Sequence, residues 1–146
     1  MPLAMLQRLL LVALLGWCLV DGALNLISFA VDPADRDRIV ATTEEGLAQS
    51  ADGGRTWMQI EGPQLSLLSW DEKSGLWGAD RNGVVHRLPR TDEGWTRSGA
   101  LPGAPEALLA QDGALYAAAS SPDGVTGIYR SSDGKSWKLL YRDGGA

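Results

Sequence analysis

Three tryptophans, Trp57, Trp95 and Trp137, recur about forty residues apart, and the same order of sequence elements surrounds each of them. A turn segment with Asp and Gly precedes each tryptophan, and three short apolar segments separated by further turns precede that turn segment. A period of this length, filled with short segments at regular turn spacing, is typical of a repeated all-β unit. The repeat therefore restricts the chain to a stack of similar small sheets.

Each unit contains four predicted strands. The first strands are expected at 26–33, 65–72 and 106–113, and the second at 38–43, 76–80 and 115–120. The third are expected at 44–50, 81–88 and 124–131, and the fourth begin at the three tryptophans. No stretch after Val31 has a helical apolar period long enough for several turns. The predicted fold is all-β, with about three four-stranded antiparallel blades forming an open or partial β-propeller, near residues 24–60, 64–99 and 105–141.

The chain divides into an apolar N-terminal segment, residues 1–23, and the repeat region, residues 24–146. The apolar run from Leu9 to Val20 follows Arg8 and is too short to span a bilayer comfortably. It fits a signal peptide or a membrane anchor, and the expected location is then extracellular, in the cell envelope or at a membrane. It also fits the remnant of a preceding blade, in which case a cytoplasmic location is expected.

The segment from Ser50 to Trp57 fits the pattern Ser-x-Asp-x-Gly-x-Thr-Trp, and two variants of it follow at blade spacing. We expect the Asp to accept backbone hydrogen bonds, the Gly to allow the unusual turn, and the Trp to pack against the blade. These roles are structural. The predicted structural residues are Ser50, Asp52, Gly54, Thr56 and Trp57 in the first copy, Asp92, Gly94 and Trp95 in the degenerate middle copy, and Ser131, Asp133, Gly134, Ser136 and Trp137 in the third.

These motifs resemble the Asp-box, or bacterial neuraminidase repeat, and the resemblance covers roughly Leu26 to Tyr141. The Asp-box proteins include sialidases, sortilin-type receptor ectodomains and photosystem II assembly factors. The resemblance implies a β-propeller whose Asp-boxes lie between the third and fourth strands of each blade, generally away from the ligand face.

A catalytic set does not emerge from the sequence. The Arg-Ile-Pro motif that carries the first sialidase arginine does not occur. The carboxylate pairs Glu44–Glu45 and Asp71–Glu72 are adjacent in sequence, so that on a strand their side chains point to opposite faces. His86 has no neighbouring His or Cys for a metal site. We therefore predict no catalytic residue, no metal site and no cofactor. A separate group of carboxylates, Asp32, Asp35 and Asp37, is expected in the loop between the first two strands.

The formal net charge of −5 argues against nucleic acid as a partner. We expect a non-catalytic, exported propeller segment that binds a protein or a glycan through the blade-end loops 42–46, 80–83 and 121–127. One alternative is a sialidase-like glycosyl hydrolase whose catalytic part is missing or degenerate. Another is an assembly or scaffold factor for a membrane complex.

Three blades are too few for an ordinary closed ring, because propellers typically have four to eight. The outer faces of the first and last blades would then contact water. Two arrangements would cover them: two copies forming a six-blade ring, or further blades in a longer chain of which this is the C-terminal part. The apolar residues from Leu9 to Val31 favour the second arrangement.

Overall fold

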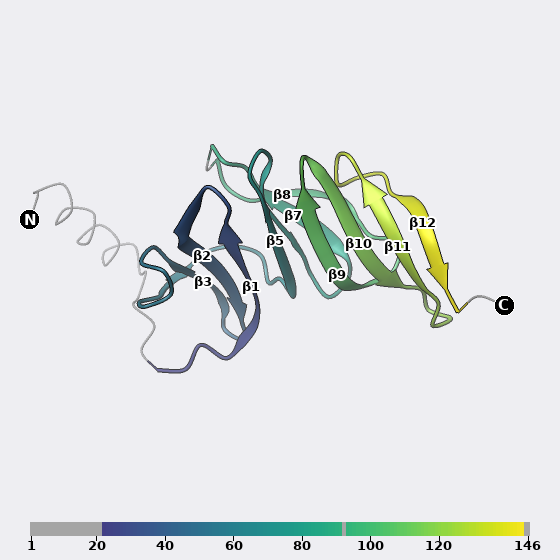
Figure 1. Ribbon diagram of the computed structural model, residues 1–146. Helices are drawn as coiled ribbons and strands as arrows, with labels where there is room; N and C mark the ends of the chain where they lie inside the picture. The colour runs from purple at the N-terminus through teal and green to yellow at the C-terminus, as the bar shows by residue number, and fades with distance from the viewer. Residues whose placement is uncertain (1–21, 92, 145–146) are drawn as a thin grey trace, which may run out of the picture.

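The structure is a computed structural model that describes residues 22–91 and 93–144, and the predicted signal segment Leu9–Val20 and Asp92 lie outside the described residues. Twelve strands form three four-stranded antiparallel sheets, each with its strands in sequence order (Figure 1). The predicted fold class, an open propeller of three blades, is confirmed. Within the described ranges, no helix is long and apolar enough to cross a membrane.

The bounds of the strands are close to those predicted. The first blade contains β1 (Leu26–Asp32), β2 (Asp35–Thr43), β3 (Gly46–Ser50) and β4 (Met58–Ile60). The second contains β5 (Leu67–Asp71), β6 (Gly75–Ala79), β7 (Val84–Leu88) and β8 (Thr96–Ala100). The third contains β9 (Ala104–Gln111), β10 (Ala114–Ser120), β11 (Thr126–Ser131) and β12 (Lys138–Asp143). The fourth strands thus begin one residue after the repeated tryptophans.

The expectation of a loop over Asp32, Asp35 and Asp37 is wrong. Asp32 ends β1, whereas Asp35 and Asp37 belong to β2. The connection consists of Pro33 and Ala34, and the Asp32 carboxylate stabilises it by accepting a hydrogen bond from the Ala34 N–H at 2.9 Å. This side-chain-to-backbone bond closes a tight turn without further residues.

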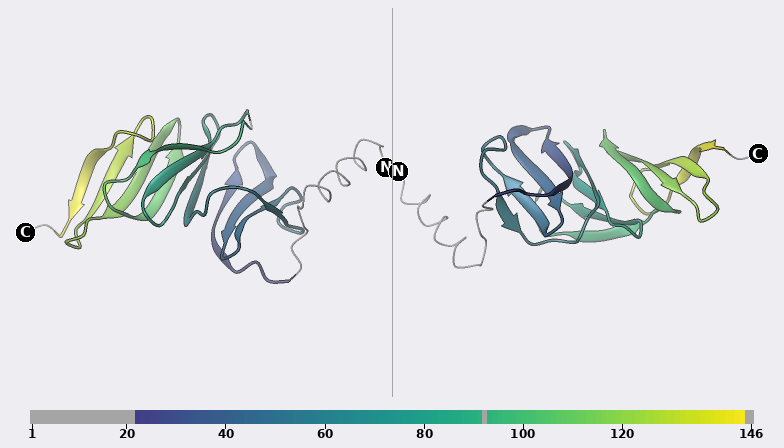
Figure 2. Two further views of the ribbon diagram at one scale, coloured as in Figure 1. Left: turned by 180° about the vertical axis from the view of Figure 1, so that it is seen from behind. Right: turned by 90° about the horizontal axis from the view of Figure 1, so that it is seen from below.

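The three sheets stand side by side in one row, and the first strands of neighbouring blades adjoin (Figures 1 and 2). β1 contacts β5, and β5 contacts β9. Among the described strands, none of the first blade contacts one of the third. The residues described therefore form an open arc.

Apolar side chains between consecutive sheets form the core. One cluster joins blades one and two and includes Val40, Leu47 and Leu76, with Trp95 packed against it. The other joins blades two and three around Trp77 and Leu115, with Trp137 packed against it. Burial of these faces between sheets is the main apolar contribution to stability. Each blade therefore depends on its neighbour.

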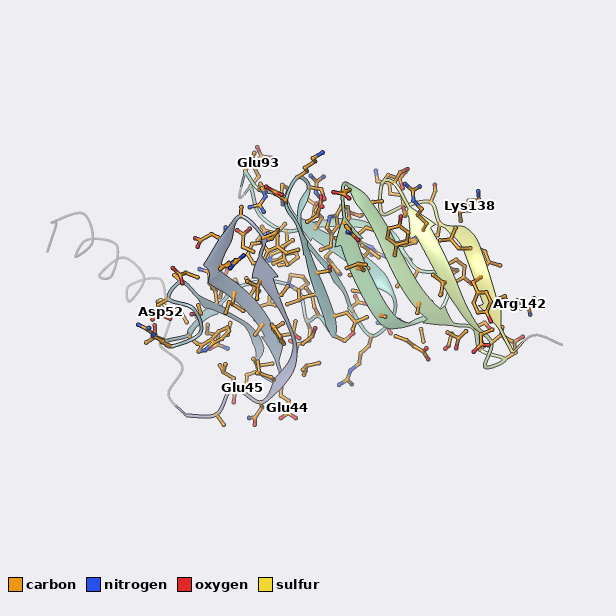
Figure 3. All side chains as sticks on the ribbon, viewed as in Figure 1. Glu44, Glu45, Asp52, Glu93, Lys138 and Arg142 are labelled. Atoms are coloured by element: carbon orange, nitrogen blue, oxygen red, sulfur yellow. The ribbon has the colours of Figure 1, made fainter. Side chains whose placement is uncertain are left out.

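The antiparallel strand order gives the arc two different rims. We call one the hairpin rim: it carries the β2–β3, β6–β7 and β10–β11 hairpins and the links between blades, residues 61–66 and 101–103. The other, the Asp-box rim, carries the turns between the first and second strands of each blade and the connections between the third and fourth strands. In Figure 3, Glu44 and Glu45 mark the hairpin rim of the first blade, and Glu93 marks the Asp-box rim of the second.

Candidate functional site

The first Asp-box is a hydrogen-bonded turn built around one carboxylate. Oδ1 of Asp52 accepts bonds from the N–H groups of Arg55 and Thr56 at 3.0 and 2.9 Å, and from the Ser50 hydroxyl at 2.8 Å. Oδ2 accepts the Thr56 hydroxyl at 2.5 Å. The Ser50 oxygen in turn accepts the Gly54 N–H at 2.9 Å. Both carboxylate oxygens thus serve the turn itself.

These bonds fix the charge of the carboxyl group and the position of the ring that follows it. The hydroxyl and N–H of Thr56, together with the Ser50 hydroxyl, lower the pKa of Asp52 to about 2. The indole Nε1–H of Trp57 donates to the Gly54 carbonyl at 2.9 Å. A group with so low a pKa stays ionised and is a poor proton donor at neutral pH.

The third Asp-box repeats this geometry. The Gly134 N–H donates to the Ser131 hydroxyl at 2.8 Å. The N–H groups of Lys135 and Ser136 donate to Asp133 Oδ1 at 2.8 and 3.0 Å and lower the pKa of this carboxyl. The Trp137 indole lies against the core of blades two and three.

The middle copy contributes packing. Gly94 has a φ of 95°, and Trp95 packs against the core between blades one and two. Asp92, the predicted carboxylate of this copy, lies outside the described residues. Asp52 and Asp133 lie on the first and third blades, whose described strands do not contact each other, so the structure does not bring these two carboxylates into one site.

The hairpin rim carries a groove of about 490 Å³ between blades one and two. Its walls come from the start of β1, the link between the two blades and the β6–β7 hairpin. It is lined by Ile27, Pro63, Gln64, Leu65, Ser66, Asp80, Arg81, Asn82 and His86. The lining combines apolar side chains from β1 and the link with polar ones that are mostly from the β6–β7 hairpin and β7.

A second groove, of about 380 Å³, follows between blades two and three on the same rim. It is lined by Asn82, Leu101, Pro102, Gly103, Ala104, Ser120, Ser121 and Pro122. Asn82 lines both grooves and is exposed. The two grooves therefore form one interrupted track across the middle blade, with the Asn82 amide at the crossing.

The β6–β7 hairpin holds the backbone of Asn82 in place. Oδ1 of Asp80 accepts the N–H groups of Asn82 and Val84 at 2.9 and 3.0 Å. Oδ2 lies 3.3 Å from Nε2 of His86, which is half-buried on β7. The Asp80 carboxylate thus stabilises the hairpin, while Arg81 and Asn82 are exposed at its tip.

Of the three loops predicted to bind, 80–83 and 121–127 contribute residues to the grooves, whereas no residue of 42–46 lines either groove. The links at residues 64–66 and 101–104 were missed as binding elements. The Pro-Gly-Ala-Pro segment that starts at Pro102 was the available signal for a tight link at a blade junction.

The described residues offer little for metal or acid–base chemistry. In residues 22–91 and 93–144, no group of three or more His, Cys, Asp and Glu side chains could hold a metal ion. Glu44 and Glu45 are both exposed at a hairpin tip.

Solved structures with the same architecture are propellers. YCF48 from Cyanidioschyzon merolae matches with a TM-score of 0.63 and 23% identity, over 85% of this chain and 40% of that chain. A chain of the nidogen/laminin complex matches with a TM-score of 0.64 and 18% identity, over 82% of this chain and 49% of that chain. YCF48 bound to D1 peptide matches with a TM-score of 0.61 and 19% identity, over 84% and 44%.

These likenesses support the propeller fold. The chain spans less than half the length of each of these three structures. No protein-family model and no curated protein sequence matches the chain.

Proposed function

We propose that this chain is an exported propeller segment that binds an extended segment of a partner protein along the hairpin rim. The observation that carries the proposal is the sharing of Asn82 by two consecutive grooves. An extended peptide rises about 3.3 Å per residue and can follow such a track, whereas a compact small ligand would occupy one groove.

The chemistry of the track suits a peptide backbone. The amides of Asn82 and Gln64 can donate to and accept from main-chain groups, and Arg81 offers a charged fork for a carboxylate. Ile27 and Pro102 give apolar contacts at either end. We infer that the partner segment carries at least one acidic residue facing Arg81.

Two likenesses support a protein partner. One solved structure similar to this chain holds a D1 peptide, and another belongs to a complex of two proteins. The role we favour is that of an assembly or scaffold factor, which captures a segment of a client without changing it chemically. The export part of the proposal rests on the apolar run Leu9–Val20 alone.

A displayed library of random twelve-residue peptides tests the proposal. We expect the full chain to select a consensus with an acidic residue, and Asn82→Ala and Arg81→Glu each to weaken binding of the selected peptide about 10-fold or more, as measured by fluorescence anisotropy. Arg36→Glu is the matched control, because Arg36 is exposed near the Asp-box rim and undergoes the same charge change.

Three results would contradict the proposal. One is a selected peptide whose affinity is unchanged by both rim variants. Another is binding on a glycan array without any peptide binding, which would support the glycan alternative. The third is hydrolysis of a sialoside substrate, which would support the enzyme alternative.

A further inference from the structure

Both ends of the arc expose apolar sheet faces. On the first blade, Phe29 and Val31 lie on either side of Ala30, which packs toward the second blade, and therefore point away from that blade; Phe29 is 61% exposed. On the third blade, Leu109 and Ile128 point away from the second blade, and Ile128 is 42% exposed. Large apolar side chains gathered on one face mark an interaction surface.

The buried joint between blades two and three shows what such faces pack against. Trp77 on β6 is directly paired with Arg87 on β7, whose guanidinium lies 5.4 Å from the ring centroid. The Asp-box turn of the third blade lies against this aromatic ring: a Cβ added at Gly134 would be 2.7 Å from the Trp77 side chain. Asp133 and Arg87 line the same cleft. The joint is thus an aromatic–arginine pair that packs on an Asp-box turn.

The free face of the third blade carries the first half of this joint. Tyr116 on β10 is directly paired with Arg130 on β11, in the same strand positions as Trp77 and Arg87. The Arg130 guanidinium lies 5.9 Å from the Tyr116 ring centroid. Ile128 and Leu109 flank this pair on paired strands. Nothing in residues 22–91 and 93–144 covers it.

The free side of the first blade carries the second half. Its Asp-box turn, Ser50–Trp57, has Gly54 bonded to the Ser50 hydroxyl as Gly134 is bonded to Ser131. Asp52 lies at one end of the row of blades. β12, with its labelled residues Lys138 and Arg142, lies at the other end (Figure 3). The Asp52 carboxylate has the charge opposite to Arg130, as Asp133 has to Arg87. The charges of the two free ends are therefore complementary.

We propose that a second copy of this chain covers both faces, with the Tyr116–Arg130 face of each copy packed on the Phe29 face and Asp-box turn of the other. One chain carries both faces of the joint. In a pair of copies, each Tyr116–Arg130 face can therefore pack on the Phe29 face of the other copy, and no further partner is needed. A ring of six blades lies within the usual range for closed propellers. Two copies also amount to about the length of the solved propeller chains, of which one copy spans 40–49%.

The joint is a head-to-tail contact that closes after two copies, which a mixing experiment can test. Sedimentation of the full 146-residue chain should give twice the chain mass. Phe29→Glu and Ile128→Glu should each raise the dissociation constant of the dimer about 100-fold or more, because each places an unpaired charge in both joints. Both residues are exposed in the single chain, so the blades should still fold, as checked by circular dichroism.

An equimolar mixture of the two variants should recover a mixed dimer. One joint of that dimer combines the unaltered third blade of the Phe29→Glu chain with the unaltered first blade of the Ile128→Glu chain. The other joint brings the two glutamates together and stays open, so the mixture should dimerise more strongly than either variant alone and more weakly than the wild type. Ala100→Glu is the control, because it adds the same charge at an exposed position on the middle blade and should leave the mass unchanged. A monomeric wild-type chain, or variants that do not form a dimer on mixing, would overturn the proposal.

Discussion

Arg90 clamps the first blade to the second through the carboxylate of Asp32, fifty-eight positions earlier in the chain. Its two terminal nitrogens lie 2.7 and 3.2 Å from the two carboxylate oxygens, a bidentate arrangement. Its Nε–H donates to the Glu72 carbonyl. Burial by itself would raise the pKa of Asp32, but the hydrogen bonds from Arg90 and from the Ala34 N–H, together with the charges of Arg90 and Arg38, outweigh it and the pKa is lowered. The pair thus ties the end of β1 to the β7–β8 connection, beside the end of β5.

Removal of one partner of this clamp should weaken the fold. The Asp32 side chain is 4% exposed and that of Arg90 is 29% exposed. We therefore expect Arg90→Met to lower the free energy of unfolding by about 2–3 kcal/mol, somewhat less than for a fully buried pair. Urea unfolding at fixed protein concentration measures this. The double variant Asp32→Ala, Arg90→Met should be less destabilised than the sum of the two single variants, and strict additivity would show that the pair does not couple the blades.

The first Asp-box should give the stability a distinct dependence on pH. The pKa of Asp52 is lowered from its ordinary value of 3.8 to about 2 in the folded chain. The folded state therefore binds fewer protons than the unfolded state between these values, and the contribution is present above pH 3.8 and lost as the pH falls toward 2. Thermal unfolding of Asp52→Asn should be less sensitive to pH over this interval than that of the wild type. An equal loss in both chains would show that Asp52 titrates normally.

Gly134 lies so close to Trp77 that a methyl group added at Gly134 should strongly lower the free energy of unfolding. Gly134→Ala would force a Cβ to within 2.7 Å of the Trp77 ring at a φ of 77°. We expect a loss of about 2–4 kcal/mol, from the backbone conformation and from overpacking together. Gly53→Ala is the matched control, because its φ is 75° but its Cβ would meet only the Asp37 carboxylate, at 3.3 Å. It should cost about 1–2 kcal/mol. Equal losses in urea unfolding would show that the contact between blades adds nothing.

Local sequence signals were sufficient for the strands and turns of this fold. A Gly-containing turn and a short apolar segment can be recognised within a window of about ten residues, and each blade repeats them. The hydrogen bonds of the turn at Asp52 are equally local, since those between Asp52 and Thr56 join residues four positions apart. The predicted loop at Asp35 failed for the same local reason: several charged residues in a row suggested a loop, whereas Asp35 pairs with Asp32 and the ladder resumes at Ile39 after an irregularity.

The hairpin rim could be predicted only in part because it depends on how the blades stack. The first groove combines Ile27 with Asn82, and the second combines Asn82 with Pro122. No sequence period links these residues, and their proximity follows from the packing of β1 on β5 and of β5 on β9. The Asp32–Arg90 pair was missed for the same reason. Contacts between repeats require the relative placement of the sheets, which the repeat unit alone does not specify.

The two Asp-box tryptophans should respond differently to the same substitution. Trp57 donates its indole N–H to the Gly54 carbonyl at 2.9 Å, whereas the Trp137 Nε1 atom is buried and has no hydrogen-bond partner among the described residues. Both rings are half-buried, so replacement with Phe removes a similar amount of packing. Trp57→Phe also loses a hydrogen bond worth about 1 kcal/mol, while Trp137→Phe removes an unsatisfied donor that costs about 1–3 kcal/mol.

We therefore expect Trp137→Phe to be nearly neutral and Trp57→Phe to be the more destabilising of the two, by about 1–3 kcal/mol. Urea unfolding followed by circular dichroism measures the difference without relying on the tryptophan fluorescence that the variants alter. Trp57→Ala and Trp137→Ala serve as controls, because both lose the whole ring and should each cost about 3 kcal/mol, the lower end for a large core side chain. If Trp137→Phe proved as costly as Trp57→Phe, the Trp137 indole would have an acceptor in solution, and a well-ordered water would be the first candidate.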